Sequence, residues 1–143
     1  MLRGLTTVAY QSADLDAAKQ WYTNVLGIEP YFNRTEYVEF RVGDYEHELG
    51  ILDSQFLPDL GTDQGGSDHQ AGTPGGAIVY WHVDDAQASY DRLIELGAAP
   101  HQPPRNFGEN FVGAAVVDPF GNILGIMQNP HYIEVVERRS ASA

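Results

Sequence analysis

The first strong pattern along the chain is helical. Between residues 15 and 26, apolar side chains recur at three- and four-residue intervals, so they fall on one face of a helix. Asp14 stands directly before this segment and can cap its N-terminus, and Gly27 can adopt the left-handed conformation that ends a helix. The pattern predicts a helix whose buried face is formed by Leu15, Ala18, Tyr22, Val25 and Leu26.

A second segment repeats the first. Residues 14–30 read DLDAAKQWYTNVLGIEP, and residues 84–100 read DDAQASYDRLIELGAAP. Asp and Gly stand thirteen residues apart in each segment, and each segment reaches a Pro three residues after its Gly. Farther along, Leu49-Gly50-Ile51 is matched by Leu124-Gly125-Ile126. These matches indicate an internal duplication, with a second helix from about Ala86 to Leu96 capped by Asp84 or Asp85.

Short segments rich in β-branched and aromatic residues surround each helix. Such segments, bounded by turn residues, predict strands. In the first half they lie at 5–12, 27–33, 35–44 and 47–53, and in the second half at 77–83, 111–118 and 122–129. A Pro-rich passage occupies 98–106.

The order of these elements predicts an α+β protein of two βαβββ modules in tandem. The first module is assigned to residues 1–52 and the second to 77–129, and together they form one structural domain. Residues 53–76 are rich in Gly, Asp, Ser and Pro without a sustained period, which predicts a linker loop. Residues 130–143 are assigned to a C-terminal tail.

Strand alternation divides the side chains of each module into two faces. We expect one face to pack on the helices, since it carries most of the large apolar side chains. The other face is expected to line a cleft enclosed by the two curved mixed sheets, with side chains that include Thr7, Gln11, Glu48, Gly50, Ile78, Tyr80, His82, Gly125 and Met127.

Composition narrows the range of functions. The chain has 143 residues and a formal net charge of −12, so its surface repels nucleic-acid backbones and anionic membranes. It contains no cysteine, which excludes disulfides, thiolate metal sites and a cysteine nucleophile. No apolar run approaches the roughly 20 residues of a membrane helix, and the N-terminus lacks signal-peptide features. We therefore expect a cytoplasmic protein whose partner is a small molecule.

Three motifs give the chain a resemblance to a known family. They are DLDAAKQWYTNVLG at residues 14–27, its weaker repeat DDAQASYDRLIELG at 84–97, and the turn DPFGN at 118–122. Together the chain resembles the glyoxalase/bleomycin-resistance/extradiol-dioxygenase group, the vicinal oxygen chelate superfamily, over residues 5 to 129. The resemblance implies a glyoxalase-like fold and a homodimer. It leaves the activity open, because the group includes isomerases, ring-cleaving dioxygenases, thiol transferases and non-catalytic drug binders.

Metal-dependent members of this group hold a divalent ion with four ligands, two from each half. The resemblance maps the first-strand ligand positions onto Thr7 and Ile78, and the last-strand positions onto Gly50 and Gly125. None of the four is a usual ligand, since such ions are bound by imidazole, carboxylate or thiolate groups. We therefore expect no metal cofactor, and this argues against lactoylglutathione lyase or dioxygenase activity.

A displaced metal or acid–base site is the alternative. Gln11, Glu48 and His82 would supply suitable ligands, and Glu48 and His82 are the candidate catalytic residues. Against this hypothesis, the second half provides no carboxylate to match Glu48. The interpretation we prefer places Glu48 near a sheet edge, gives His82 an ordinary hydrogen bond within its strand, and assigns Gln11 to the turn before the helix.

The candidates for binding without a metal lie on several predicted strands. Tyr80 and His82 point the same way, so they can stack on a planar ligand, hydrogen-bond to it or act as acid and base, although packing with one satisfied hydrogen bond is the simpler interpretation. Glu39 and Arg41 form either part of the cleft or a solvated cross-strand pair. Arg105, in the passage RNFGENF, belongs either to a lid over a ligand or to an ordinary loop. Gln11 and Met127 complete the predicted ligand-binding set, while His47, His69, His101 and His131 are placed in turns or loops.

Two functional hypotheses follow. The first is a metal-independent protein that binds a small, partly aromatic or apolar molecule, as drug-binding members of the group do. The alternative is a glyoxalase-like lyase, isomerase or dioxygenase-related enzyme with a displaced metal or acid–base site.

Overall fold

The computed structural model describes residues 1, 3–56 and 77–143. These residues form two compact units, one from each half of the sequence, and Phe120–Asn122 cluster with the first unit although the flanking strands belong to the second. Most of the predicted linker, residues 57–76, lies outside the described residues, and so does His69. Within the described chain, no helix is long and apolar enough to cross a bilayer.

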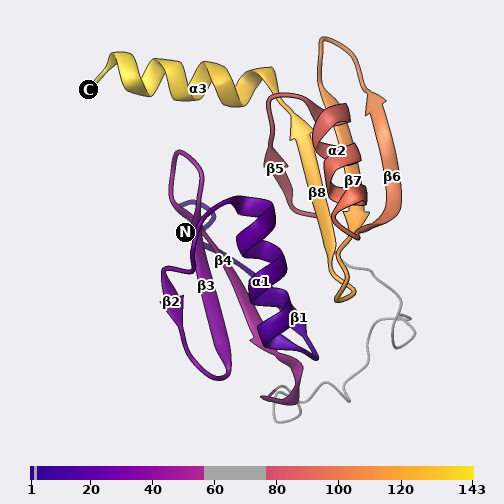
Figure 1. The fold of residues 1–143 in the computed structure, drawn as a ribbon. Coiled ribbons are helices and arrows are strands. Elements are labelled where there is room, and N and C mark those ends of the chain that lie inside the picture. Colours follow the sequence, from indigo (N-terminus) through magenta and orange to yellow (C-terminus); the bar gives the residue numbers. More distant parts are fainter. Residues whose placement is uncertain (2, 57–76) are drawn as a thin grey trace. The chain divides into compact units, whose positions relative to one another are not determined.

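The first unit is a four-stranded sheet with one helix on it (Figure 1). The strands are β1 (Thr7–Ser12), β2 (Phe32–Asn33), β3 (Tyr37–Val42) and β4 (His47–Asp53), arranged in the order β1-β4-β3-β2. β1 runs parallel to β4, and the remaining pairs are antiparallel. Helix α1 (Leu15–Leu26) packs on β3 and β4, and a 3₁₀ turn (Ser54–Phe56) follows β4.

The second unit repeats this arrangement (Figure 1). Its strands are β5 (Tyr80–His82), β6 (Ala99–Asn106), β7 (Val112–Val117) and β8 (Ile123–Gln128), in the order β5-β8-β7-β6. β5 is parallel to β8, as β1 is to β4. Helix α2 (Ala86–Glu95) packs on β6, β7 and β8. The predicted α+β fold of two βαβββ modules is therefore confirmed for each unit.

The helix ends follow the predicted capping chemistry. Asp14 accepts a hydrogen bond from the Ala17 amide, and Gly27 ends α1 with a φ of 68°. Asp85, one of the two candidates, caps α2 by accepting from the Ala88 amide. Each cap satisfies a backbone donor that the helix itself leaves unpaired.

The core of each unit lies between its helix and its sheet. The predicted helix-facing strand side chains Val8, Leu49 and Ile51 are at most 8% exposed in the first unit. Leu124 and Ile126 occupy the same positions in the second unit and are equally buried. Successive side chains of a strand point to opposite faces of the sheet. The burial of these residues against the helix therefore fixes which of their neighbours point away from the helix.

Two segments differ from the sequence-based expectation. The Pro-rich passage forms β6, an edge strand, where missing proline donors do not interrupt a sheet, and its pairing with β7 shifts register twice. Residues of the predicted tail form α3 (Pro130–Ala141), because Asn129 caps the helix and Pro130 occupies its first turn.

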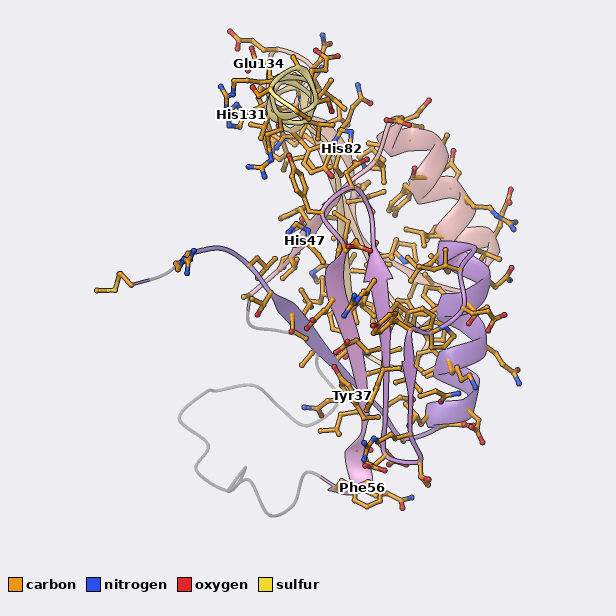
Figure 2. All side chains as sticks on the ribbon, turned by 90° about the vertical axis from the view of Figure 1, so that its left-hand side faces the viewer. Tyr37, His47, Phe56, His82, His131 and Glu134 are labelled. Carbon is orange, nitrogen blue, oxygen red and sulfur yellow. The ribbon has the colours of Figure 1, made fainter. Side chains whose placement is uncertain are left out.

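Three histidines that were predicted in turns or loops belong to regular elements instead, although the predicted strand at 47–53 already contained His47. His47 begins β4, His101 lies in β6, and His131 lies in the first turn of α3, where it is 3.5 Å from Glu134 (Figure 2). The prediction was wrong because it rested on neighbouring turn residues, while strand pairing and the Asn129 cap extend the elements over these positions.

Candidate functional site

The face of the first sheet that points away from α1 carries a polar cluster, and we call it the first open face. Thr7, Glu48 and Arg41 lie side by side on β1, β4 and β3, because Glu48 pairs with both of the others. The Thr7 hydroxyl donates a hydrogen bond to the Glu48 carboxylate. Glu48 is therefore held within the sheet by its neighbour, and it is only half-buried.

Tyr37 fills the space above Gly50 on this face. Its hydroxyl donates a 2.9 Å hydrogen bond to Glu39, the residue that pairs with Gly50. A Cβ added at Gly50 would overlap the Tyr37 ring. Figure 2 shows Tyr37 on the side of the strands away from α1. The position onto which the resemblance maps a metal ligand is thus covered by a phenol ring.

The acidic surroundings of Tyr37 make its phenol hard to ionise. Burial, the hydrogen bond to Glu39 and the negative charges of Glu39 and Glu48 together raise the pKa of Tyr37 to about 12. Tyr37 is consequently a neutral hydrogen-bond donor at physiological pH, and its donor is already used by Glu39.

This raised pKa predicts an alkaline loss of stability. Because the folded-state pKa lies above the value of about 10 for a free phenol, the folded state holds its proton more tightly, and this contribution is lost as pH rises from about 10 to 12. We expect Tyr37→Phe to flatten the decline of the unfolding free energy in this range. Urea unfolding at several pH values measures it, with Tyr31→Phe as the control. An equal decline in wild type and Tyr37→Phe would contradict the assignment.

Arg41 does not bind either carboxylate of the first open face. Its guanidinium lies 3.6 Å from the centroid of the Tyr31 ring, and in the described part of the chain no carboxylate is within ion-pair distance of it. The hypothesis of a Glu39–Arg41 ion pair is therefore not met, although both side chains lie on this face.

Gln11 stands farther along β1. Its side chain is exposed, and its backbone amide and carbonyl are both bound by the Asn122 side chain, at 3.1 and 2.8 Å. Gln11 pairs with Leu52, four residues beyond Glu48 on β4. The sheet thus separates two of the three residues of the hypothetical displaced metal site along the strand direction.

The second sheet has a corresponding surface on the side away from α2, and we call it the second open face. Tyr80 on β5 pairs with Gly125, which pairs with Ala115, which in turn pairs with Gln102. The Tyr80 hydroxyl donates a 3.0 Å hydrogen bond to the Gln102 side chain, on the far edge strand. The Tyr80 ring must therefore lie across the two small residues, and the residue remains 39% exposed.

Gly125 is closely covered, as Gly50 is. A Cβ at this position would lie 2.6 Å from the Val79 carbonyl oxygen and 2.9 Å from both Ile78 Cγ2 and Tyr80 Cδ1. Any side chain at residue 125 would therefore force the backbone before β5 to move.

A second aromatic ring covers the neighbouring row of the second open face. Phe107, in the loop after β6, lies over Gly113, whose added Cβ would be 3.2 Å from the Phe107 ring and 3.7 Å from the Met127 methyl. Arg105 pairs with Gly113, and its guanidinium is 5.3 Å from the Phe107 centroid. The loop itself is a closed turn, with a backbone hydrogen bond from the Phe107 amide to the Phe111 carbonyl.

His82 is held by the start of α3. Its Nδ1 accepts a 3.3 Å hydrogen bond from the Asn129 amide, and its ring stacks on Tyr132 with centroids 4.5 Å apart. Its Nε2 lies 3.6 Å from Asp84, and the side chain is 13% exposed. Figure 2 shows His82 beside α3. These contacts agree with a packed strand histidine, with one ring nitrogen already occupied as an acceptor.

The predicted site residues thus divide between the two faces. Glu39, Arg41, Glu48 and Gln11 belong to the first sheet, whereas Tyr80, His82, Met127 and Arg105 belong to the second. Sequence reasoning missed Tyr37 and Gln102, and it considered Phe107 only as part of the passage RNFGENF. For Tyr37 a signal was available, since it shares the alternation of Glu39 and Arg41 on one strand.

The four mapped metal positions do not fit a divalent ion. Thr7 offers a hydroxyl that already donates to Glu48, Ile78 offers no donor atom, and Gly50 and Gly125 have no side chain and no space for one. Across residues 1, 3–56 and 77–143, no three His, Asp or Glu side chains gather as metal ligands would.

Comparison with known proteins agrees with this architecture. The family model described as Glyoxalase/Bleomycin resistance protein/Dioxygenase superfamily matches residues 4–126. A glyoxalase-related enzyme from Fulvimarina pelagi is 22% identical, with a TM-score of 0.67 and 90% of each chain covered.

Two other solved structures are similarly distant. The bleomycin resistance determinant of transposon Tn5 is 21% identical, with a TM-score of 0.60, and 90% of this chain and 99% of that chain are covered. A glyoxalase/bleomycin resistance protein/dioxygenase from Nocardioides is 20% identical, with a TM-score of 0.61 and coverages of 90% and 84%. No curated protein matches the chain. Because the family model spans most of the sequence, the chain belongs to the glyoxalase/bleomycin resistance protein/dioxygenase superfamily.

Proposed function

We propose that this protein binds a small, flat, partly aromatic or apolar molecule on its second open face, without a metal ion. The observation that carries the proposal is the pair of covered glycines. At both positions where metal-dependent relatives place a carboxylate, the chain has a glycine with a tyrosine ring against it, Tyr37 at Gly50 and Tyr80 at Gly125. The two rings replace ligand groups with aromatic surface in both halves.

The second open face supplies the surface that such a molecule needs. Tyr80 and Phe107 are 39% and 66% exposed. Met127 pairs with Gly113, which the Phe107 ring covers, and it stands two residues from Gly125, which pairs with Tyr80. Aromatic rings and a thioether bind planar apolar groups through stacking and dispersion, with little loss of side-chain entropy for the rigid rings. Gln102 and Arg105 add polar groups at one edge, which would orient a ligand.

One structural neighbour is consistent with this function. The Tn5 protein is a bleomycin resistance determinant, and bleomycin is therefore a reasonable first probe besides a generic planar dye. The contacts of Glu48 and His82 favour binding over the alternative enzyme, because Thr7 and Asn129 already engage these two candidate catalytic groups.

Two further features belong to the proposal. We infer a homodimer, which the family resemblance implies, and light scattering of the purified chain tests it. We also infer a cytoplasmic location, which the lack of cysteine favours.

Metal content and dye binding together test the proposed function. Purified protein is incubated with Ni, Zn, Fe or Mn, dialysed and analysed for metal, and Nile red and bleomycin are titrated separately. We expect less than stoichiometric metal, no thermal stabilisation by these ions, and saturable binding of at least one probe. Tyr80→Ala is expected to weaken probe binding about fivefold, since stacking on one ring contributes about 1 kcal/mol.

The matched control for Tyr80 is Phe56→Ala, which removes an aromatic ring that is 55% exposed in the 3₁₀ turn after β4. It should leave probe binding unchanged. One equivalent of tightly held metal that is lost in Glu48→Ala would overturn the proposal in favour of the displaced metal site. Equal effects of the Tyr80 and Phe56 substitutions would remove the second open face as the binding surface.

A further inference from the structure

The second sheet is free of acidic residues in an acid-rich chain. Twenty Asp and Glu residues stand against eight Lys and Arg residues in the whole sequence, and the first sheet includes Glu39, Glu48 and Asp53. Strands β5, β6, β7 and β8 contain no Asp or Glu, and their single Lys or Arg residue is Arg105. The strands that form the second open face therefore carry a net positive charge on a strongly negative protein.

The guanidinium of Arg105 has no carboxylate partner among the residues that the structure describes. It lies 5.3 Å from the Phe107 centroid. Stacking on a ring leaves the edge of a guanidinium, with its N–H donors, free to bind a planar anion. Arg41 on the first open face also stacks on a ring, but Glu48 lies beside it in the sheet. Arg105 is thus better placed than Arg41 to receive an anion.

The surface next to Arg105 is flat and apolar. Gly113, Ala115 and Gly125 place no large side chain on the middle strands, Met127 adds an apolar side chain beside Gly113, and Tyr80 and Phe107 provide rings. A flat molecule that lies on these residues would reach Arg105 at its edge, because Arg105 pairs directly with Gly113.

From this juxtaposition we propose that the ligand is a flat apolar carboxylic acid. Its ring system contacts Tyr80 and Phe107, and its carboxylate accepts hydrogen bonds from the Arg105 guanidinium, which matches a carboxylate in a two-pronged geometry. The inference rests on the proposed function, and it makes Arg105 the residue that selects the charge of the ligand. The negative charges elsewhere on the protein oppose an anion beside Arg105 only weakly, because salt at physiological ionic strength screens charges that are more than about 8 Å away.

Three probes of one shape separate the charge effect from the stacking effect. The full-length protein is titrated calorimetrically with 2-naphthoic acid, its uncharged amide 2-naphthamide, and the cation 2-naphthylmethylamine. We expect the acid to bind about tenfold more tightly than the amide, and the amine to bind most weakly. In Arg105→Gln, the affinity for the acid should fall to that of the amide, while the affinity for the amide stays the same. Arg105→Lys should retain part of the preference, since it keeps the charge and loses the paired donors.

Arg92→Gln is the matched control, because it removes an exposed arginine from α2 that pairs with Glu95 at 3.5 Å. It should not alter the ranking of the three probes. Equal affinities for acid and amide, or tightest binding of the amine, would overturn the carboxylate inference and leave the proposed function standing. A wild-type protein that binds none of the three probes would overturn both. Circular dichroism of each variant verifies that it is folded.

Discussion

Gly125→Ala is expected to destabilise the protein by about 1–3 kcal/mol, although a glycine in a strand is usually improved by alanine. The added methyl would lie 2.6 Å from the Val79 carbonyl oxygen, so the backbone before β5 must shift to admit it. A glutamate at this position, onto which the resemblance maps a metal ligand, would meet the same obstacle with a larger side chain. Urea unfolding of Gly125→Ala and wild type measures the difference.

Gly50→Ala is the matched control from the duplicated position. Its methyl would overlap only the outer end of the Tyr37 ring, which can turn away by breaking its hydrogen bond to Glu39. We expect a loss of about 1 kcal/mol, the usual value of one such hydrogen bond. If Gly125→Ala proved neutral or stabilising, the close approach at Gly125 would not exist in solution, and the main argument for a binding protein would fail.

Tyr22→Ala is expected to cost about 3–5 kcal/mol, the usual range for removal of a buried aromatic ring. Tyr22 is fully buried in the first unit, and its ring centroid lies 6.1 Å from that of Tyr10, 4.8 Å from Trp21 and 6.5 Å from Phe40. The cavity left by the substitution would remove contacts from three other rings. The measurement is the urea midpoint and the unfolding free energy derived from it.

Tyr31→Ala provides the comparison, since Tyr31 is 64% exposed and its ring stacks on the Arg41 guanidinium. It should lose less than about 1 kcal/mol. Should Tyr22→Ala fail to express, Tyr22→Leu retains part of the ring volume and is expected to lose less. Similar losses for Tyr22→Ala and Tyr31→Ala would show that α1 is not docked on its sheet by this ring.

The helices and the central strands could be predicted because their signals are local. The caps Asp14 and Asp85 and the terminator Gly27 act on backbone groups within a few residues, so their chemistry is visible in the sequence. The alternation that buries Leu49 and Ile51 is also local, and it correctly assigned the faces of β4. Edge strand β6 was harder to predict from the sequence, because its prolines disfavour a strand locally and only pairing with β7 maintains it.

The candidate site was predicted in part. Alternation placed Tyr80, His82 and Met127 on one face, in agreement with the register between β5 and β8. It could not show that α3 engages His82, since the Asn129 amide lies 47 residues farther along the chain. It also could not pair Arg105 with Phe107, because the shape of the loop that brings them together depends on the bulged β6.

The fold and the lack of ligand groups at the four mapped metal positions follow from the sequence alone. The duplication aligned Gly50 with Gly125, and residue type excludes side-chain donors there. Only the folded chain shows which side chains fill the space at Gly50 and Gly125. The rings of Tyr37 and Tyr80 come from neighbouring strands and lie across these glycines. The physical reason is that a side chain's direction is set locally by strand alternation, whereas the space it fills depends on which strands the sheet brings beside it.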